Sequence, residues 1–123
     1  MLNNKADPNI CWKGESPLYI ASHRGYTEIV ELLLNNKADP NICWKAKSPL
    51  YTASRHGYTE IVKLLLNNKA DPNICWTGES PLYIASHYDH TEIARLLLNN
   101  KADPNICWKG ESPLYIAYHR GYT

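Results

Sequence analysis

The chain has 123 residues, 44% of them hydrophobic, and its 13 basic and 12 acidic side chains give a formal net charge of +1. This length suits one domain, and the balanced charge argues against electrostatic binding to nucleic acid or to an anionic membrane. The sequence shows neither an apolar run long enough to span a bilayer nor the apolar stretch of a signal peptide at its start, so we expect a cytoplasmic or nuclear protein.

One pattern repeats along the chain at intervals of 32 residues. Cys-Trp pairs begin at positions 11, 43, 75 and 107, and Ser-Pro-Leu-Tyr segments begin at positions 16, 48, 80 and 112. A fixed period of about 20 to 50 residues is typical of a solenoid, in which each unit buries its apolar face against its neighbours. We predict a single array over 1–123, made of the tail of a preceding repeat (1–10), full repeats (11–42, 43–74 and 75–106) and a truncated repeat (107–123).

The first predicted helix of a unit begins at Pro17. Ser16 is suited to cap it, because its hydroxyl can accept a backbone N–H of the first turn, and proline at the first helical position loses no hydrogen bond. Gly25 is expected to end this helix in the left-handed conformation. Asp89 replaces that glycine in the third unit, where the same conformation would be strained.

The second predicted helix begins at Thr27 and Glu28, with a negative charge near its N-terminus. Its buried stripe is predicted to consist of Ile29, Val30 and the leucines at 32–34. The Ala-Asp-Pro-Asn segment at 38–41 has the composition of a turn. The connector at 42–47 then leads to the next Ser-Pro pair. Because it carries glycine in the sister units, it is predicted to form a short hairpin-like finger.

These motifs together resemble the ankyrin repeat. Segment 16–21, Ser-Pro-Leu-Tyr-Ile-Ala, is similar to the family motif Thr-Pro-Leu-His-x-Ala, and 25–34 is similar to Gly-His-x-Glu-Ile-Val-x-Leu-Leu-Leu. The resemblance covers essentially the whole chain. It implies an all-α solenoid of helix-turn-helix units joined by short fingers, whose fingers and first helices line a concave face. It also implies a protein-binding role without identifying the partner.

The chain departs from the family pattern in three ways. Its unit has 32 residues instead of about 33, so the finger is one residue short. Lys37 stands where the family has a glycine before Ala-Asp, and we expect Asn36 to take the left-handed conformation instead. Tyrosine replaces the family histidine, so the inter-repeat hydrogen bonds of that histidine are not carried over. These tyrosines are Tyr19, Tyr51, Tyr83 and Tyr115.

The cysteines and the histidines are two groups of residues that could form chemical sites. Equivalent cysteines in stacked units should lie about 10 Å apart, too far for a disulfide or a shared metal ion, so we interpret them as reduced, semi-buried side chains. The histidines form no metal-binding helical pair, and surface contact or solvation is the favoured interpretation. We predict neither an enzyme nor a cofactor, because no catalytic constellation stands apart from the repeat.

The candidate partner-binding residues lie in the finger and at the end of the first helix, where the copies differ from one another. Such variation is expected of a partner-reading surface and also of neutral drift at solvated positions. The tryptophans form a column that either packs on neighbouring fingers or presents an exposed aromatic stripe. The candidates are Trp12, Lys13, Glu15, His23, Arg24, Trp44, Lys45, Lys47, Arg55, His56, Trp76, Thr77, Glu79, His87, Tyr88, Trp108, Lys109, Glu111, His119 and Arg120.

A column of lysines at positions 5, 37, 69 and 101 runs beside a column of aspartates at 7, 39, 71 and 103. Mutual neutralisation is favoured, and an acidic peptide partner is the alternative. The changes from Ile20 to Thr52 and from Val30 to Ala94 are interpreted as drift that softens the core.

Two functions fit the sequence. The first is a protein-interaction scaffold that binds a protein or peptide through the concave face. The alternative is a structural spacer with no partner of its own. End-to-end self-association is also expected, because the ends of the array would expose apolar faces. Neither nucleic acid nor membrane is an expected partner.

Overall fold

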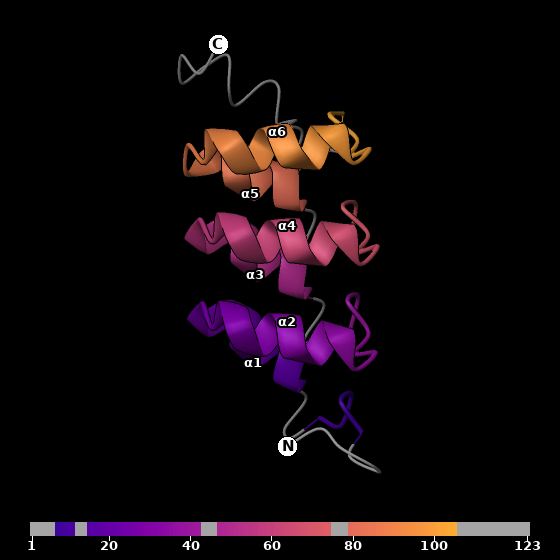
Figure 1. The fold of residues 1–123 in the computed structure, drawn as a ribbon. Coiled ribbons are helices and arrows are strands. Elements are labelled where there is room, and N and C mark those ends of the chain that lie inside the picture. Colours follow the sequence, from indigo (N-terminus) through magenta and orange to yellow (C-terminus); the bar gives the residue numbers. More distant parts are fainter. Residues whose placement is uncertain (1–6, 12–14, 43–46, 75–78, 106–123) are drawn as a thin grey trace.

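The computed structural model describes residues 7–11, 15–42, 47–74 and 79–105. Figure 1 shows three helix pairs stacked along one axis, with one row of helices in front of the other. The inner helices are α1 (Pro17–Arg24), α3 (Pro49–His56) and α5 (Pro81–His87), and the outer helices are α2 (Thr27–Asn35), α4 (Thr59–Asn67) and α6 (Thr91–Asn99). Each row packs along its own length, α1 on α3 and α3 on α5, and likewise α2 on α4 and α4 on α6.

This arrangement confirms the predicted all-α repeat solenoid. In the described ranges, strand structure is limited to the isolated bridge residues Glu15, Lys47 and Glu79, which precede the inner helices. The predicted fingers at 12–14, 43–46 and 75–78 lie outside the described residues.

Each inner helix begins at its Ser-Pro pair, as the sequence predicts. The hydroxyl oxygens of Ser16, Ser48 and Ser80 accept the backbone N–H groups of Tyr19, Tyr51 and Tyr83 at 3.0, 3.0 and 2.9 Å. The three serines are buried. A capping hydroxyl of this kind is worth about 1 kcal/mol of helix stability.

The inner helices end with the six-to-one hydrogen bond of a Schellman motif. After α1, the N–H of Tyr26 donates to the carbonyl of Ala21 at 2.9 Å, and the residue between the helices, Gly25, has φ 79°. Gly57 has φ 80° and ends α3 in the same way, so the predicted left-handed glycines are confirmed. Asp89 occupies the corresponding position after α5, with φ 62°.

The outer helices end in the same motif, but the prediction that Asn36 is left-handed is wrong. Asn36 has φ −104°, whereas Lys37 has φ 71°. The N–H of Ala38 donates to the carbonyl of Leu33, which requires positive φ at the intervening Lys37. Asn36 instead uses its side-chain amide, which donates to the carbonyl of Leu32 at 2.8 Å. Lys69 and Lys101 repeat this geometry, with φ 70° and 74°.

A lysine in the left-handed region is strained by its Cβ, and glycine is not. We expect Lys69→Gly to raise the free energy of unfolding by roughly 0.5 to 1 kcal/mol, after the entropy that glycine adds to the unfolded chain is deducted. The matched control is Lys63→Gly inside α4, which should cost about 1 kcal/mol. Urea denaturation measures both, and a loss of stability in Lys69→Gly would contradict the assigned strain.

The same reasoning applies to Asp89. Its side chain accepts a hydrogen bond from the Thr91 hydroxyl at 3.4 Å, which is long and exposed. We therefore expect Asp89→Gly to stabilise the protein by roughly 0.5 to 1 kcal/mol. A thermal melt measures the change, and Asp89→Asn, which keeps the strain, serves as the control. Equal melting temperatures for both variants would show that the left-handed strain is negligible here.

One continuous apolar core runs through all three helix pairs, and it includes Leu18, Leu50 and Leu82 from the inner helices and Val30, Leu65 and Leu97 from the outer ones. The predicted stripe of α2 is only partly correct, because Ile29 and Leu32 are 47% and 50% exposed. The equivalent Ile61 is 1% exposed, since α2 packs on α4. Ile29 lies on the side of α2 that no described helix covers, and with Ile10, Ile20 and Tyr26 it lines a hollow of about 360 Å³.

The Asp-Pro-Asn turns join neighbouring units through hydrogen bonds that the sequence analysis did not foresee. The side-chain oxygens of Asn9, Asn41 and Asn73 accept the backbone N–H groups of Asp39, Asp71 and Asp103 at 2.8, 2.6 and 2.8 Å. We call this set the asparagine ladder. Each aspartate side chain also accepts the N–H of the asparagine two residues later, which confirms the predicted turn.

Candidate binding surface

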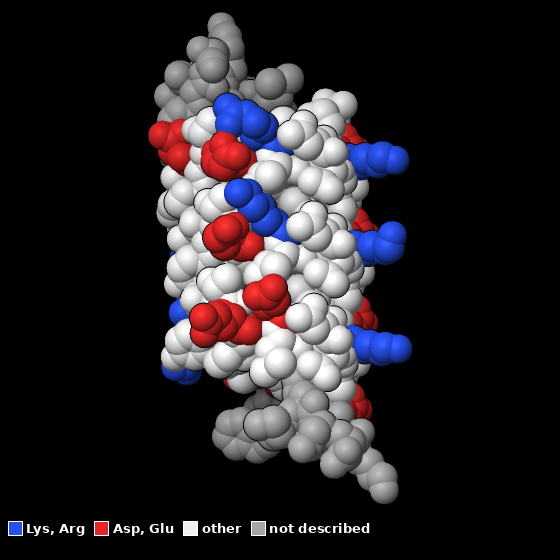
Figure 2. Space-filling model, in the orientation of Figure 1, with Lys and Arg blue, Asp and Glu red and all other residues white. Residues whose placement is uncertain are grey.

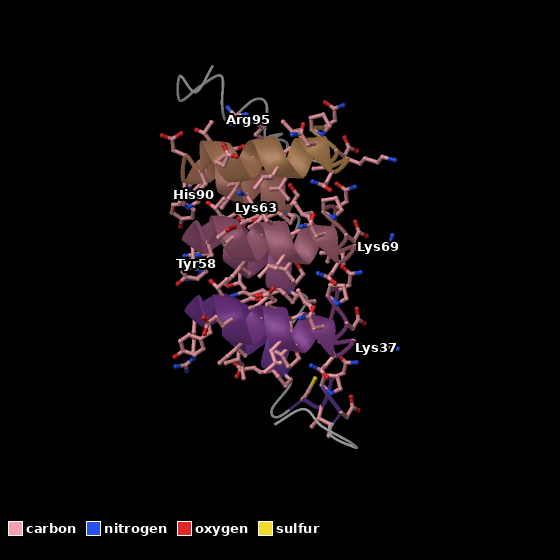
Figure 3. All side chains as sticks on the ribbon, viewed as in Figure 1. Lys37, Tyr58, Lys63, Lys69, His90 and Arg95 are labelled. Atoms are coloured by element: carbon pink, nitrogen blue, oxygen red, sulfur yellow. The ribbon has the colours of Figure 1, made fainter. Side chains whose placement is uncertain are left out.

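The inner helices end at one edge of the stack, where short turns connect them to the outer helices. We call residues 23–26, 55–58 and 87–90 the turn edge. Figure 3 shows Tyr58 and His90 on this edge, at the left, and Lys37 and Lys69 at the opposite edge. All four described histidines, His23, His56, His87 and His90, lie on the turn edge.

The inner helices place these side chains in solvent because their other faces are buried in the stack. In α1 the buried residues are Leu18, Tyr19, Ala21 and Ser22, which leaves His23 and Arg24 exposed at the last turn. Arg55 and His56 are exposed at the end of α3, and Tyr88 is 44% exposed after α5. The turn edge is therefore an accessible surface on a packed scaffold.

Aromatic rings from adjacent units touch along this edge. Tyr19 stacks on His23 with ring centroids 5.8 Å apart, and the His23 and His56 rings form a T-shaped pair with centroids 4.9 Å apart. His56 in turn stacks on Tyr58 at 5.4 Å. These rings form a continuous row across the junction between the first and second units.

Thr52 anchors both imidazoles of this row. Its hydroxyl oxygen lies 3.0 Å from Nδ1 of His23, and its carbonyl oxygen accepts a hydrogen bond from Nδ1 of His56 at 2.8 Å. Thr52 itself is 2% exposed. The interpretation of Thr52 as drift did not include this role, in which its hydroxyl takes part in a contact between units.

The junction between the second and third units uses a different set of contacts. The Arg55 guanidinium lies over the Tyr88 ring, with Cζ 5.3 Å from the centroid. The His87 and Tyr88 rings form a T-shaped pair with centroids 4.8 Å apart. His90 donates from Nε2 to the carbonyl oxygen of Arg55 at 3.1 Å. The same scaffold thus presents two different surfaces at successive junctions.

The buried tyrosines supply polar contacts of their own in place of the family histidine. The phenol of Tyr51, which is 1% exposed, donates to Oε1 of Glu79 in the next unit at 2.6 Å. Burial and the Glu79 carboxylate both raise the pKa of Tyr51 far above its ordinary value. Burial also raises the pKa of Tyr19, against the lowering effect of a hydrogen bond with Thr52.

Burial lowers the pKa of His23 below its ordinary value of 6.5, and the positive charges of His56, Lys47 and Arg24 add to this effect against Glu15. The unfolded chain then binds the His23 proton more tightly than the folded chain does. The stability linked to neutral His23 is present above the unfolded-state pKa and is lost as the pH falls through it.

We therefore expect the free energy of unfolding to decrease between about pH 7.5 and pH 5.5, a range in which histidine titrates and most carboxyl groups do not. The free energy of unfolding of the His23→Gln variant should decrease less over the same pH range. Chemical denaturation at several pH values measures both slopes. Parallel slopes for the two proteins would show that His23 does not contribute.

Of the predicted site residues, the structure brings together His23 with His56, and Arg55 with His87 and Tyr88. Glu15, Lys47 and Glu79 lie at the finger bases, and Arg24 lies beside His23. The residues that sequence reasoning missed are Thr52, Tyr58 and His90, although the variation at Tyr26, Tyr58 and His90 was a usable signal. Eleven predicted residues lie outside the described ranges: Trp12, Lys13, Trp44, Lys45, Trp76, Thr77, Trp108, Lys109, Glu111, His119 and Arg120.

Lys37, Lys69 and Lys101 are exposed, and Figure 2 shows a row of basic side chains projecting from the edge opposite the turn edge. Within the described ranges, no ion pair joins these lysines to the aspartate column. The ion pairs lie on the outer helices instead, Lys63 with Glu60 at 3.9 Å and Arg95 with Glu92 at 2.6 Å. The expected neutralisation therefore does not take the form of direct pairing.

The described part of the chain contains no group of three or more His, Cys, Asp or Glu side chains that could hold a metal ion. Cys11 is free and exposed, so the expectation of semi-buried cysteines is wrong at this position. The other cysteines, Cys43, Cys75 and Cys107, lie outside the described residues. None of the helices in the described ranges is long and apolar enough to cross a membrane.

Two family models match this chain. The model described as ankyrin repeats (3 copies) matches residues 1–75, and the model described as ankyrin repeat matches residues 77–109. The chain therefore belongs to the ankyrin-repeat family, whose members generally act as protein–protein interaction modules. No curated protein matches the chain.

Proposed function

We propose that this array binds a partner protein through the surface formed by the inner helices, the finger bases and the turn edge. One observation carries the proposal, namely where the three described units differ from one another. The four successive positions of the turn edge all vary between units: His23, Arg55 and His87 share one column, and Arg24, His56 and Tyr88 share the next.

The rest of each described unit is much more uniform. Apart from the finger and its base, the other columns that differ are those of Ile20, Val30 and Glu31. Two core columns and one exposed column of the outer helices therefore change, whereas all four columns of the turn edge change from unit to unit. A surface of varied aromatic and cationic groups on a rigid support is suited to recognising a particular partner.

The test begins with selection of peptides of about a dozen residues from a random library on the intact chain, followed by measurement of their affinities for variants. Arg55→Ala and Tyr88→Ala should each weaken binding about tenfold or more, because exposed arginine and tyrosine are typical interface anchors. Both side chains are exposed, so the fold should survive truncation. Lys63→Ala and Arg95→Ala are matched controls on the outer helices, labelled in Figure 3, and should change affinity little.

The proposal would be contradicted if the outer-helix substitutions weakened peptide affinity and the turn-edge substitutions did not, because binding would then involve another surface. Failure to select any peptide above background would favour the alternative function, a structural spacer without a partner. The role of the tryptophan column in partner binding stays a prediction, because these residues lie outside the described ranges.

A further inference from the structure

We propose that the His23–His56 pair is a carboxylate-binding site for an acidic segment of the partner, and that protonation of the pair strengthens this binding. The inference rests on the proposed function, since it names the chemistry of the partner at the same surface.

In each of the two imidazoles, one ring nitrogen already makes a hydrogen bond within the protein. Nδ1 of His23 and Nδ1 of His56 both bond to Thr52, at 3.0 and 2.8 Å. Among the described residues, no hydrogen bond uses the Nε2 atom of either ring. His56 donates from Nδ1 to a carbonyl, so its neutral tautomer has the free lone pair on Nε2.

Protonation of His56 therefore takes place at the unbonded Nε2 and leaves its hydrogen bond to Thr52 in place. His23 can keep its contact with Thr52 as well, because a hydroxyl oxygen accepts a hydrogen bond from a protonated Nδ1. In the doubly protonated pair, each ring would offer an Nε2–H donor at the exposed turn edge, in addition to the Thr52 bonds already made. The ring centroids are 4.9 Å apart. A carboxylate has two oxygen acceptors and a negative charge, and it is thus the complement of two adjacent imidazolium donors.

The charged groups around the pair also favour an anion. Arg24 from the end of α1 and Lys47 from the base of α3 act electrostatically on His23, together with His56, and Glu15 opposes them. The remaining neighbours are rings, Tyr19 stacked on His23 and Tyr58 stacked on His56. Two imidazoles can also form part of a metal site, but the positive charges of Arg24 and Lys47 disfavour a cation at this place.

The other two described histidines make different contacts. Nε2 of His90 is bonded to the carbonyl of Arg55. His87 is half-buried, stacked on Tyr83 and in edge contact with Tyr88.

The direction of the pH effect follows from linkage. A bound carboxylate stabilises protonated His23 and raises its pKa, so binding takes up a proton and tightens as the pH falls. If the pKa of His23 rises by about one unit, the affinity should increase about fivefold between pH 7.5 and pH 5.5.

The experiment uses the full chain with synthetic hexaglutamate as the probe and hexaglutamine as the uncharged comparison. We expect the hexaglutamate affinity, measured by calorimetry, to rise about fivefold from pH 7.5 to pH 5.5. The hexaglutamine affinity should not rise. The double variant His23→Gln/His56→Gln should lose the rise, whereas Lys63→Gln/Arg95→Gln, which removes two positive charges on the outer helices, should keep it. NMR titration of the His23 ring should show a higher pKa with hexaglutamate bound.

Two outcomes would overturn the inference: an affinity for hexaglutamate that does not change with pH, or a pH effect that survives in His23→Gln/His56→Gln. Circular dichroism of each variant at both pH values separates loss of binding from loss of folding. The library-selected peptides keep the two proposals distinguishable, because turn-edge binding without pH dependence would refute the carboxylate site and leave the proposed function standing.

Discussion

Replacing Leu65 by alanine is expected to lower the free energy of unfolding by about 3 to 5 kcal/mol, the largest effect of any single substitution considered. Leu65 lies in α4 of the middle unit and is 0% exposed. The substitution removes buried methyl groups and leaves a cavity that the helices on either side, α2 and α6, can fill only partly.

Leu32→Ala is the control, because it makes the same chemical change on an outer helix at a side chain that is 50% exposed. It should cost less than about 1 kcal/mol. Urea denaturation followed by circular dichroism gives both values. Because the core is continuous through the three pairs, we also expect the middle-unit defect to make unfolding less cooperative, which would appear as a lower m-value in Leu65→Ala. Equal losses for the two variants would contradict the assigned core.

Gly57→Ala is expected to destabilise the protein by about 2 to 3 kcal/mol, the second-largest effect. Two costs add at this position. Gly57 has φ 80°, which an alanine adopts only with strain. A Cβ at Gly57 would also come within 2.8 Å of Cε1 of His90 in the next unit, so the ring would have to move and its hydrogen bond to Arg55 would be weakened.

A double-mutant cycle with His90→Ala separates the two costs. In the background without the imidazole, Gly57→Ala should retain only the left-handed strain, about 1 to 2 kcal/mol. An identical loss of unfolding free energy in both backgrounds would show that the His90 ring moves aside without an energetic penalty. The packing of Gly57 against His90 would then contribute nothing to the cost of the substitution. The same geometry occurs at Gly25, where the covering ring is Tyr58.

Local chemistry made most of the fold predictable. A Ser-Pro pair can start a helix and a glycine can end it without reference to any distant residue, and Ser16, Pro17 and Gly25 behave as these rules predict. The left-handed lysines were not predictable in this way. Lysine has no preference for positive φ, and it adopts this conformation at Lys37 because the hydrogen bonds of the helix end and the burial of Ala38 require it.

The sequence predicted which part of each unit would form the candidate site, but it did not predict the individual contacts within that site. The comparison of the copies with one another pointed to the end of the first helix, and His23, Arg55 and Tyr88 are on the turn edge as expected. The contact between His23 and His56 joins residues of different units, so it depends on how the units are aligned when they stack. The role of Thr52 was missed for the same reason, because its hydrogen bond to His23 exists only across that junction.

The asparagine ladder gives the array a further property, which concerns its length. Every rung joins an asparagine of one unit to the backbone N–H of the next unit at the same position in the repeat. If residues 43–74 were excised as a block, Asn41 would meet the N–H of Asp103 in place of that of Asp71, and Gly25 would meet His90 in place of Tyr58. The stack already contains contacts of both types, because Asn73 accepts the N–H of Asp103 and Gly57 lies against the His90 ring. Loss or duplication of a whole unit would therefore keep the ladder and the glycine contacts, whereas the turn-edge contacts would change, because Ile84 would replace Thr52 opposite His23. Recombination between the near-identical copies would thus alter both the span of the array and its turn edge while keeping the stacking contacts.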